Sequence, residues 1–296
     1  MILIADSGST KTDWALVDDS TVLTRIKTQG INPFNQDEEK IRQIVSSELL
    51  PSLDKVSEGR GISALYFYGS GCTPEMGEGL RKILVDYFPD TREIECNGDL
   101  LAAARAVCGR NAGIACILGT GANSCLYDGT KIIANTPPLG YILGDEGSGA
   151  VLGKLFMNGI FKGFLPEKLK NEYLEWAGLT YADVIRKVYR EPLANRFLAK
   201  TANFIASHLD EEPLLAQMVE DNFRSFFDKN LVQYEQVLEQ KEYSMLNVQC
   251  SKKKVGFVGG ISYQFSAQLK KIANEKGYEV NMIMKSPIDG LIGYHS

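Results

Sequence analysis

Histidine is scarce in this chain, and its cysteines are scattered. The 296 residues contain two histidines, His208 and His295, and six cysteines, none of which forms a CxxC pair. A structural zinc site takes four such ligands in closely spaced pairs, so the sequence argues against one. Most of the cysteines lie in apolar runs such as Ala115-Cys116-Ile117. That setting favours reduced thiols packed in a core.

Long apolar runs and an excess of positive charge are also absent. A membrane-spanning helix needs about 18 consecutive apolar residues, and no stretch of the chain is that long. The chain opens with Met-Ile-Leu-Ile-Ala-Asp, without the basic region of a secretory signal. The formal net charge of -5 gives no long-range attraction for nucleic acid or an anionic membrane. We therefore expect a cytoplasmic protein that binds neither.

The composition is that of an ordinary globular protein, with 44% hydrophobic and 23% charged residues. A length of 296 residues exceeds the usual size of one domain, which is about 100 to 200 residues. We therefore expect two domains, each with its own hydrophobic core.

A short pattern of strands and turns occurs twice along the chain, at residues 2–26 and 114–134. Each copy has three short apolar runs, with a turn of small residues after the first run and an Asp-containing turn before the third. Short apolar runs separated by turn residues are typical of strands. The sequence therefore predicts the same three-stranded meander at two places.

Strand and helix patterns alternate through the rest of the chain. The predicted strands are residues 64–68, 92–96, 254–258 and 278–283. The predicted helices lie at residues 41–49, 80–87, 100–107, 262–275 and 288–294, with a largely helical region from 169 to 238.

This order predicts an α/β protein with duplicated architecture, in which two phosphate turns face each other across an interdomain cleft. We place the hinge near Cys108. The first domain then covers residues 1–108, completed by the C-terminal helix 286–296. The second domain covers residues 109–285 and carries the helical insertion.

The first small-residue turn has the composition of a phosphate-binding loop. Glycine lets the backbone approach a polyphosphate closely, hydroxyl groups can donate to it, and a lysine adds positive charge. A carboxylate directly before such a turn repels phosphate unless a cation intervenes, so Asp6 indicates Mg²⁺ held through water. The predicted phosphate-binding residues here are Gly8, Ser9, Thr10 and Lys11.

A single turn of this kind is weak support, because many β-hairpins carry the same residues for turn geometry alone. The second meander repeats it as Gly119, Thr120 and Gly121. The chain contains no Walker A loop, and neither turn leads into a helix as a dinucleotide fingerprint would. We therefore predict that both turns hold ATP phosphates.

The order of these motifs resembles the sugar kinase, actin and heat-shock chaperone superfamily. Within it, Gly119-Thr120-Gly121-Ala122-Asn123 followed by Gly144-Asp145-Glu146-Gly147-Ser148 is similar to the N-acetylglucosamine kinases and the wider BadF/BadG/BcrA/BcrD ATPase family. The resemblance runs over nearly the whole chain. It implies two ribonuclease-H-like domains of the actin-like ATPase type, the first on the sugar and phosphate side and the second on the nucleotide side. It also implies ATP with Mg²⁺ and a homodimer.

The resemblance assigns the catalytic base to Asp99, which follows a predicted strand and precedes a predicted helix. Phosphoryl transfer needs positioning, Mg²⁺ and a carboxylate that takes the proton of the hydroxyl. The alternative for Asp99 is a helix N-cap. Gly259-Gly260 follows the predicted strand 254–258, and the resemblance places both glycines on the adenine side of the nucleotide.

Acidic and amide side chains are suited to sugar hydroxyls. The predicted sugar contacts are Asp99 itself together with Asn32, Ser70, Asn123, Gly140, Asp145 and Glu146. Asp145 and Glu146 could instead cap the following helix, and Asn32 and Ser70 could be plain turn residues. The animal family members have Gly-Gly-Trp-Gly before Gly-Asp-Glu-Gly-Ser, whereas this chain has Pro137-Pro138-Leu139-Gly140. This departure leaves the amino sugar open.

We therefore expect an ATP-dependent kinase of an amino sugar, with N-acetylglucosamine first and glucosamine or N-acetylmuramic acid as alternatives. A second alternative from the same family is an ATPase that drives electrons through an iron-sulfur cluster into a dehydratase. Such ATPases have a cysteine in the stretch at the second phosphate turn, and the matching stretch of this chain contains Cys116. A third is an actin-like or chaperone-like scaffold, which has no obvious use for the Asp145-Glu146 loop.

Overall fold

The computed structural model describes residues 1–8, 10–57, 60–239 and 253–296, apart from the side chains of residues 238 and 239. These residues form two compact units. Unit 1 consists of residues 1–111, 129–131 and 286–296, and unit 2 of residues 112–128 and 132–285. The chain thus passes from unit 1 to unit 2, returns to unit 1 briefly at residues 129–131, and returns again for its last segment.

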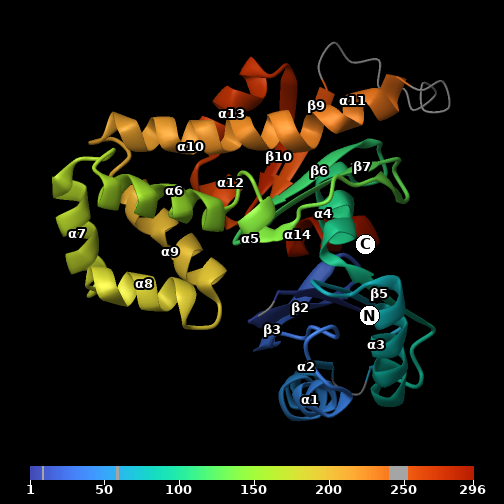
Figure 1. Cartoon of the computed structure of the whole chain (residues 1–296). Coiled ribbons are helices and arrows are strands. Elements are labelled where there is room, and N and C mark those ends of the chain that lie inside the picture. The colour runs from blue at the N-terminus through green and yellow to red at the C-terminus, as the bar shows by residue number, and fades with distance from the viewer. Residues whose placement is uncertain (9, 58–59, 240–252) are drawn as a thin grey trace. The chain divides into compact units, whose positions relative to one another are not determined.

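Unit 1 contains a five-stranded sheet in the order β3-β2-β1-β4-β5 (Figure 1). Its strands are β1 (Ile2–Ser7), β2 (Lys11–Asp18), β3 (Thr21–Gln29), β4 (Ala64–Gly69) and β5 (Glu93–Gly98). The first three form an antiparallel meander, and β1, β4 and β5 are parallel. Parallel strands have helices on both faces, which explains why their sequences read as apolar runs.

The helices of unit 1 cover the two faces of this sheet. They are α1 (Glu38–Ile44), the π-helical turn η1 (Val45–Leu49), α2 (Leu50–Ser57), α3 (Pro74–Tyr87), α4 (Asp99–Cys108) and α14 (Ile288–His295). Leu3 and Ala5 of β1 join the core that contains residues of α1 and α3, while α4 and α14 pack against each other and against β1 and β4. Because side chains alternate along a strand, Ile4 and Asp6 point away from the core of Leu3 and Ala5.

Unit 2 repeats the same sheet. Its order is β10-β9-β6-β7-β8, with β6, β9 and β10 parallel and β6–β7–β8 an antiparallel meander. The strands are β6 (Gly113–Leu118), β7 (Ala122–Tyr127), β8 (Ile132–Ala134), β9 (Lys253–Val258) and β10 (Tyr278–Met284). Strand for strand, this is the topology of unit 1.

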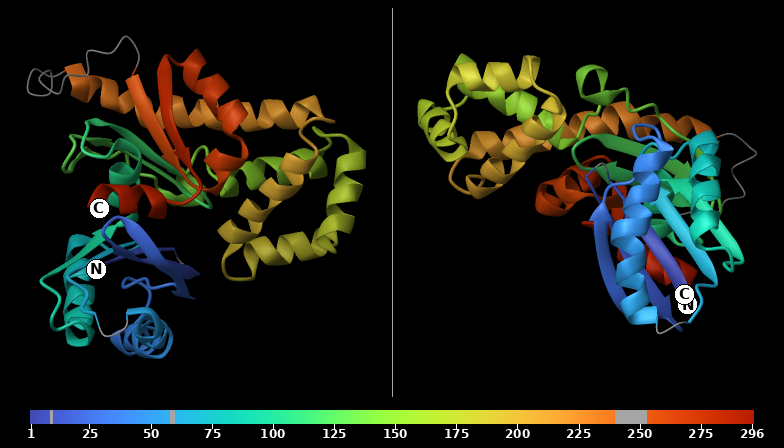
Figure 2. Two further views of the ribbon diagram at one scale, coloured as in Figure 1. Left: turned by 180° about the vertical axis from the view of Figure 1, so that it is seen from behind. Right: turned by 90° about the horizontal axis from the view of Figure 1, so that it is seen from below.

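Most helices of unit 2 lie between β8 and β9 in the chain. They are α5 (Gly140–Leu143), α6 (Gly149–Lys162), α7 (Glu167–Ala177), α8 (Tyr181–Tyr189), α9 (Ala194–Ser207), α10 (Pro213–Phe226), the π-helical turn η2 (Phe227–Leu231) and α11 (Val232–Glu239). Within unit 2, α7 and α8 lie at the end away from β9 and β10, as the views in Figures 1 and 2 agree. Two further helices, α12 (Gly260–Gln264) and α13 (Ser266–Glu275), join β9 to β10.

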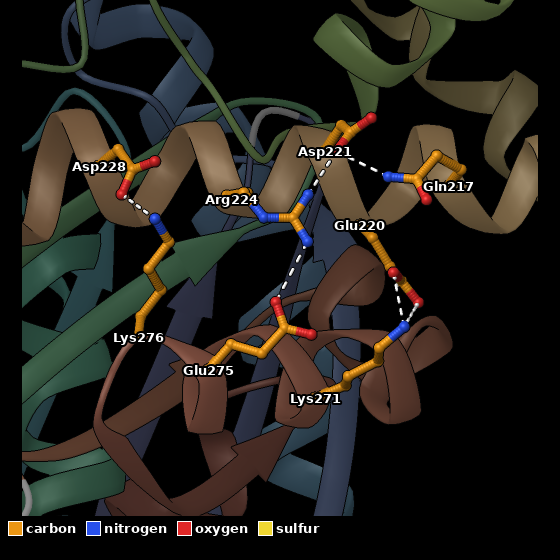
Figure 3. A network of polar contacts seen from close by, with 8 residues as sticks. All are labelled: Gln217, Glu220, Asp221, Arg224, Asp228, Lys271, Glu275 and Lys276. Atoms are coloured by element: carbon orange, nitrogen blue, oxygen red, sulfur yellow. Dashed lines mark hydrogen bonds and ion pairs between the residues drawn. The ribbon is translucent and has the colours of Figure 1, made fainter.

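Charged side chains join α13 to the long α10–η2 helix (Figure 3). Lys271 donates to both carboxylate oxygens of Glu220 at 2.8 Å, and Arg224 contacts Glu275 at 3.1 Å. Lys276 pairs with Asp228 one turn further on. The Glu220 side chain is mostly buried, whereas the other pairs are exposed and contribute little each. The packing of α13 on unit 2 depends mainly on its buried residues Leu269, Ile272 and Ala273, which belong to the hydrophobic core.

The predicted fold class is confirmed in both units, as is every predicted strand. One helix prediction is wrong: residues 262–275 form two helices, α12 and α13, with a break at Phe265. The Phe265 side chain is buried in the core of unit 2. The backbone therefore leaves helical geometry where this side chain turns inward, and local periodicity alone does not show such a break.

Candidate functional site

The predicted site residues of unit 1 follow the ends of three neighbouring strands. Ser7 of β1 pairs with Gly69 of β4, and Gly69 pairs with Gly98 of β5, so the three parallel strands end in register. The turn after Ser7, the residue Ser70 and the residue Asp99 therefore leave the same edge of the sheet side by side. In open α/β sheets this carboxyl edge is where ligands bind.

Asp6 lies half-buried near the end of β1. Burial raises the pKa of its carboxyl to about 6, and the negative charges of Asp13 and Asp99 act in the same direction. Asp13 is the cross-strand neighbour of Asp6 on β2. A hydrogen bond from Ser286 Oγ to Asp6 Oδ2, 2.9 Å long, partly opposes the shift. Three carboxylates are thus gathered at this edge of unit 1.

The described residues of the first small-residue turn are exposed, and backbone hydrogen bonds hold them. The Gly8 N–H donates to the Lys11 carbonyl at 3.0 Å, and the Thr10 carbonyl accepts from Gly30. Gly8, Thr10 and Lys11 are exposed, and the Lys11 ammonium forms an ion pair with Asp13. The predicted phosphate contact Ser9 lies outside the described residues. The lysine charge is therefore shared with a carboxylate.

Asp99 is the first residue of α4, and the N-cap position before it is taken by Gly98. The N-cap alternative for Asp99 is therefore wrong by one position. Burial raises the pKa of Asp99 above its ordinary value, whereas the backbone N–H groups of Asp99 and Leu100 hydrogen-bond the carboxylate and oppose this. The helix dipole favours the ionised form as well. The result is a half-buried carboxylate, held in place and with raised basicity.

Asn32 and Ser70 lie together in unit 1. Asn32 Oδ1 accepts from the N–H groups of Phe34 and Asn35 at 3.0 and 3.2 Å, which makes it an Asx-turn residue. Its Nδ2 lies 3.5 Å from Ser70 Oγ. Gly71 has a φ of +77°, and a Cβ there would lie 2.3 Å from Asn32 Oδ1. The predicted turn role of Asn32 is thus present, and its amide nitrogen faces Ser70.

In unit 2, the second small-residue turn touches the Gly259 turn. Val258 pairs with Ile117 and with Met284, so β6, β9 and β10 also end nearly in register. Gly259 has a φ of +129°, and a Cβ on it would lie 2.2 Å from the Leu118 carbonyl oxygen. Only glycine allows the two segments to pack this closely. Gly260, by contrast, is exposed with open space around it.

The turn Gly119–Gly121 also supports the start of α6. The carbonyls of Gly119 and Thr120 accept from the N–H groups of Gly149 and Ala150 at 2.8 and 3.1 Å. The Gly119 N–H donates to the Gly121 carbonyl at 2.9 Å. The backbone of this turn is therefore fixed by the helix that follows the acidic loop.

Asp145 and Glu146 have different surroundings within that loop. Asp145 has a φ of +55°, which strains a residue other than glycine, and a Cβ added to Gly121 would lie 3.0 Å from its Oδ2. Burial raises the pKa of Asp145, although the Ala122 backbone N–H hydrogen-bonds it. Burial would raise the pKa of Glu146 too, but its 2.9 Å contact with Lys229 brings the net shift below the ordinary value.

Neither acidic residue caps α6, so that alternative is wrong. Ser148 is the N-cap, and its buried hydroxyl accepts from the Val151 N–H. The alternative overlooked that Gly147-Ser148-Gly149 contains a better cap than the carboxylates before it. Asp145, with its strained backbone and half-buried carboxylate, is left without a capping role.

Asn222 holds this loop, and no pattern in the sequence indicates it. The side chain is 3% exposed on α10. It accepts from the Gly147 N–H at 3.0 Å and donates to the Ser148 carbonyl at 3.2 Å. The signal that could have indicated Asn222 is a polar residue on the apolar face of an amphipathic helix. That signal does not identify its partner Gly147, which lies 75 residues away in the chain.

Asn123 and Gly140 complete the predicted sugar residues of unit 2. Asn123 Oδ1 accepts from Asn135 Nδ2 at 2.8 Å and from the Ser124 N–H at 2.9 Å. Gly140 is exposed with a φ of +72° at the start of α5. A pocket of about 560 Å³ lies beside the acidic loop. Its lining includes Pro137, Pro138, Leu139, Glu146, Lys229 and Asn230.

The residues around Asp6 suit a hydrated divalent cation. In the described part of the chain, no three His, Cys, Asp or Glu side chains form a metal-binding group. Mg²⁺ usually keeps several waters and takes one or two carboxylates together with substrate phosphates, so it needs no such cage. Asp6 offers a half-buried carboxylate beside Asp13 and Asp99, whose negative charge a cation would offset.

The fold agrees with solved kinase structures over the whole chain. A provisionally named N-acetylglucosamine kinase from Porphyromonas gingivalis has 45% identity and a TM-score of 0.90, with 100% of this chain and 98% of that chain covered. A provisionally named N-acetylglucosamine kinase from Chromobacterium violaceum has 17% identity and a TM-score of 0.66, covering 100% and 99%. A ROK family glucokinase from Streptomyces griseus has 14% identity and a TM-score of 0.56, covering 99% and 97%.

No protein-family model matches the sequence, and no curated protein matches it. The fold and these relatives define a two-domain sugar kinase of the actin-like ATPase type. At 45% identity over its full length, the chain belongs to the N-acetylglucosamine kinase-like family within that class. It is a phosphotransferase, as predicted.

The alternative of an electron-transferring ATPase is not favoured. Cys116, which would stand near the cluster ligand, is fully buried inside β6. The five cysteines in the described part of the chain are buried or half-buried and form no disulfide, and Cys250 lies outside it. Within the same part, none of the helices is long and apolar enough to span a bilayer.

Proposed function

We propose that this chain transfers the γ-phosphate of ATP to a hydroxyl of an amino sugar, with N-acetylglucosamine as the first candidate. The name of the Porphyromonas gingivalis relative, at 45% identity, supports this substrate class. The Streptomyces griseus glucokinase, which shares the fold, was solved with glucose and AMPPNP, which supports ATP as the donor. Glucosamine and N-acetylmuramic acid are the rival acceptors.

The observation that carries the proposal is the position of Asp99. It follows β5 at the edge where the β1 turn and Ser70 also emerge, and it lies near enough to Asp6 for the two charges to interact. The two backbone N–H groups hold its carboxylate in place, and burial raises its pKa above the ordinary value although these N–H groups oppose the shift. A kinase needs such a carboxylate near the phosphate-binding turn.

In the proposed reaction, the acceptor hydroxyl oxygen bonds to the γ-phosphorus as the bond to the ADP oxygen breaks. The hydroxyl proton passes to Asp99, and ADP leaves with the electron pair of the broken bond. Asp6 would hold Mg²⁺ through water, and the cation would neutralise charge on the phosphates. Lys11 would add positive charge once phosphate competes with Asp13.

The remaining residues take binding roles in this proposal. Backbone N–H groups of the two small-residue turns would bind phosphates, and the Gly259 turn would lie against adenine. The proposed phosphate and nucleotide contacts are Gly8, Ser9, Thr10, Lys11, Gly119, Thr120, Gly121, Gly259 and Gly260. The proposed sugar contacts are Asn32, Ser70, Asn123, Gly140, Asp145 and Glu146. Of these sugar contacts, Asn32 and Ser70 belong to unit 1 and the other four to unit 2.

A panel of acceptors in a coupled assay for ADP release tests the substrate. N-acetylglucosamine, glucosamine, N-acetylmuramic acid and glucose should be compared at equal concentration, with ATP and Mg²⁺. We expect the highest kcat/KM with N-acetylglucosamine. ATP hydrolysis that none of the sugars stimulates would contradict the kinase proposal.

The substitution Asp99→Asn tests the base. It removes the proton acceptor without changing volume, so turnover should fall by about 100-fold or more while ATP and sugar still bind. Asp289→Asn is the matched control, since Asp289 also lies in the first turn of a unit 1 helix but is exposed and pairs with Arg25. If Asp99 acted only through the helix dipole, both variants would behave alike.

Two further proposals concern the state of the protein. The resemblance suggests a homodimer, which light scattering during size-exclusion chromatography would measure. The cysteines of the described residues form no disulfide, which suits the reducing cytoplasm, where we place the enzyme. A monomer at micromolar concentration would remove the dimer proposal without affecting the catalytic one.

A further inference from the structure

Asp6 is held by a side chain from the far end of the sequence. Ser286 Oγ donates to Asp6 Oδ2 at 2.9 Å, across 280 residues. The same hydroxyl oxygen accepts from the Ile288 N–H at 3.4 Å. Because its lone pair faces the first turn of α14, the hydroxyl hydrogen is free to point at Asp6. The serine therefore acts as a directed donor to the carboxylate.

Ser286 lies where the chain returns from unit 2 to unit 1, directly after Lys285. Pro287 follows it as the buried N-cap of α14 and restricts Ser286 to extended backbone. Two residues before Ser286, the Met284 carbonyl accepts from the Gly259 N–H at 2.9 Å within unit 2. This returning segment thus makes one hydrogen bond in each unit, each to a predicted nucleotide-binding residue.

The electrostatics of unit 1 explain why Asp6 needs such a donor. Its neighbours Asp13 and Asp99 are both acidic, and Lys11 is engaged with Asp13. A hydrogen bond to a charged group is among the stronger ones in proteins, and it fixes the direction of the carboxylate as well. Without it, repulsion from Asp13 and Asp99 would favour other rotamers of Asp6.

We propose that Ser286 is a positioning residue that orients the Asp6 carboxylate toward the magnesium of bound MgATP. The inference rests on the proposed function, in which Asp6 holds the cation through water. Ser286 itself touches neither phosphate nor sugar in this role. Its effect should therefore appear in nucleotide binding only when Mg²⁺ is present.

Calorimetric titration with AMPPNP provides a readout that does not depend on turnover. Affinity should be measured with Mg²⁺ and with excess EDTA for the wild type, Ser286→Ala, Ser286→Thr and Ser63→Ala. We expect Ser286→Ala to weaken binding about tenfold or more with Mg²⁺ and to leave binding in EDTA unchanged. Ser286→Thr keeps the hydroxyl and should restore the wild-type value. Ser63→Ala removes a hydroxyl that bonds the Met1 carbonyl elsewhere in unit 1, and should have no effect.

A double-mutant cycle guards against a general loss of structure. In an Asp6→Ala background, adding Ser286→Ala should change MgAMPPNP affinity no further, because the partner is already gone. Equal weakening with and without Mg²⁺, or additive effects in the cycle, would overturn the positioning role. A wild type whose nucleotide affinity is indifferent to Mg²⁺ would instead overturn the metal role of Asp6. The two failures are therefore distinguishable.

Discussion

His295 should make the stability of unit 1 depend on pH. It lies in α14, where its ring stacks on Tyr66 at a centroid distance of 3.6 Å and its Nε2 lies 2.7 Å from the Tyr68 hydroxyl. Burial lowers the pKa of His295 to about 4, and the guanidinium groups of Arg105 and Arg110 act in the same direction. The ring is therefore neutral at pH 7 in the folded protein.

The sign of the effect follows from comparing folded and unfolded protein. The ordinary pKa of 6.5 applies to the unfolded chain, and the folded value of about 4 is lower, even though Glu95 opposes the shift. The unfolded chain therefore binds more protons, and stability falls as pH drops from 6.5 toward 4. At 1.36 kcal/mol per pKa unit the full effect is about 3 kcal/mol, of which about 2 kcal/mol is lost between pH 7 and pH 5.

Tryptophan fluorescence can report unit 1 alone. The chain has two tryptophans. Trp14 is buried in unit 1 and Trp176 is 55% exposed in unit 2, so Trp176→Phe leaves a reporter of unit 1 at little structural cost. Urea unfolding in this background should be measured at pH 7 and pH 5, with and without His295→Phe. The phenyl ring keeps the stacking on Tyr66 but cannot take up a proton.

We expect the protein with His295 to lose about 2 kcal/mol more than His295→Phe between the two pH values. Acidic groups that titrate in the same range contribute equally to both proteins and cancel in the difference. Equal losses in the two proteins would refute the reasoning. They would mean that α14 detaches before His295 is protonated, or that the ring is already charged in the folded state.

The remaining predictions concern unit 2. Gly259→Ala should destabilise it by about 3 kcal/mol or more in urea, because its Cβ would meet the Leu118 carbonyl in a backbone conformation that alanine avoids. Gly260→Ala should be nearly neutral or slightly stabilising, since nothing lies near its Cβ, and equal costs would contradict this. Asn222→Ala should cost about 1 to 3 kcal/mol by leaving the Gly147 N–H unpaired, and should raise the sugar KM more than the ATP KM. An unchanged KM for the sugar would contradict a role of the acidic loop in sugar binding.

Much of the fold was predictable because its signals are local. The strands of both meanders are short apolar runs between turn residues, and their recurrence gave the duplicated topology. The helix of residues 100–107 and the strand before it follow from periodicity, so Asp99 could be placed between them. The pattern left open whether Asp99 is the N-cap of that helix. The structure shows that Gly98 is the N-cap and that Asp99 is the first residue of the helix.

The parts that local patterns did not predict depend on contacts between distant residues. Ser286 and Asp6 lie 280 residues apart, and Asn222 bonds Gly147 from 75 residues away. The break at Phe265 depends on which side chain the core of unit 2 takes in. Helix propensities and turn residues do not indicate these contacts, because the contacts depend on how side chains from distant parts of the chain pack together.

The duplication also shows how two matching turns come to differ in chemistry. Gly8 and Gly119 open equivalent turns, and each glycine N–H bonds a carbonyl two or three residues ahead. The residue two places before each glycine differs: Asp6 pairs across the meander with Asp13, whereas Ile117 pairs with Asn123. The first meander therefore brings two carboxylates together beside its turn, whereas the matching positions of the second meander carry an isoleucine and an asparagine. The carboxylate that lies against the second turn, Asp145, comes from the acidic loop and not from the meander. Recurrence of the turn predicts phosphate binding twice, and the paired carboxylates Asp6 and Asp13 are the reason why we propose the metal at the first turn.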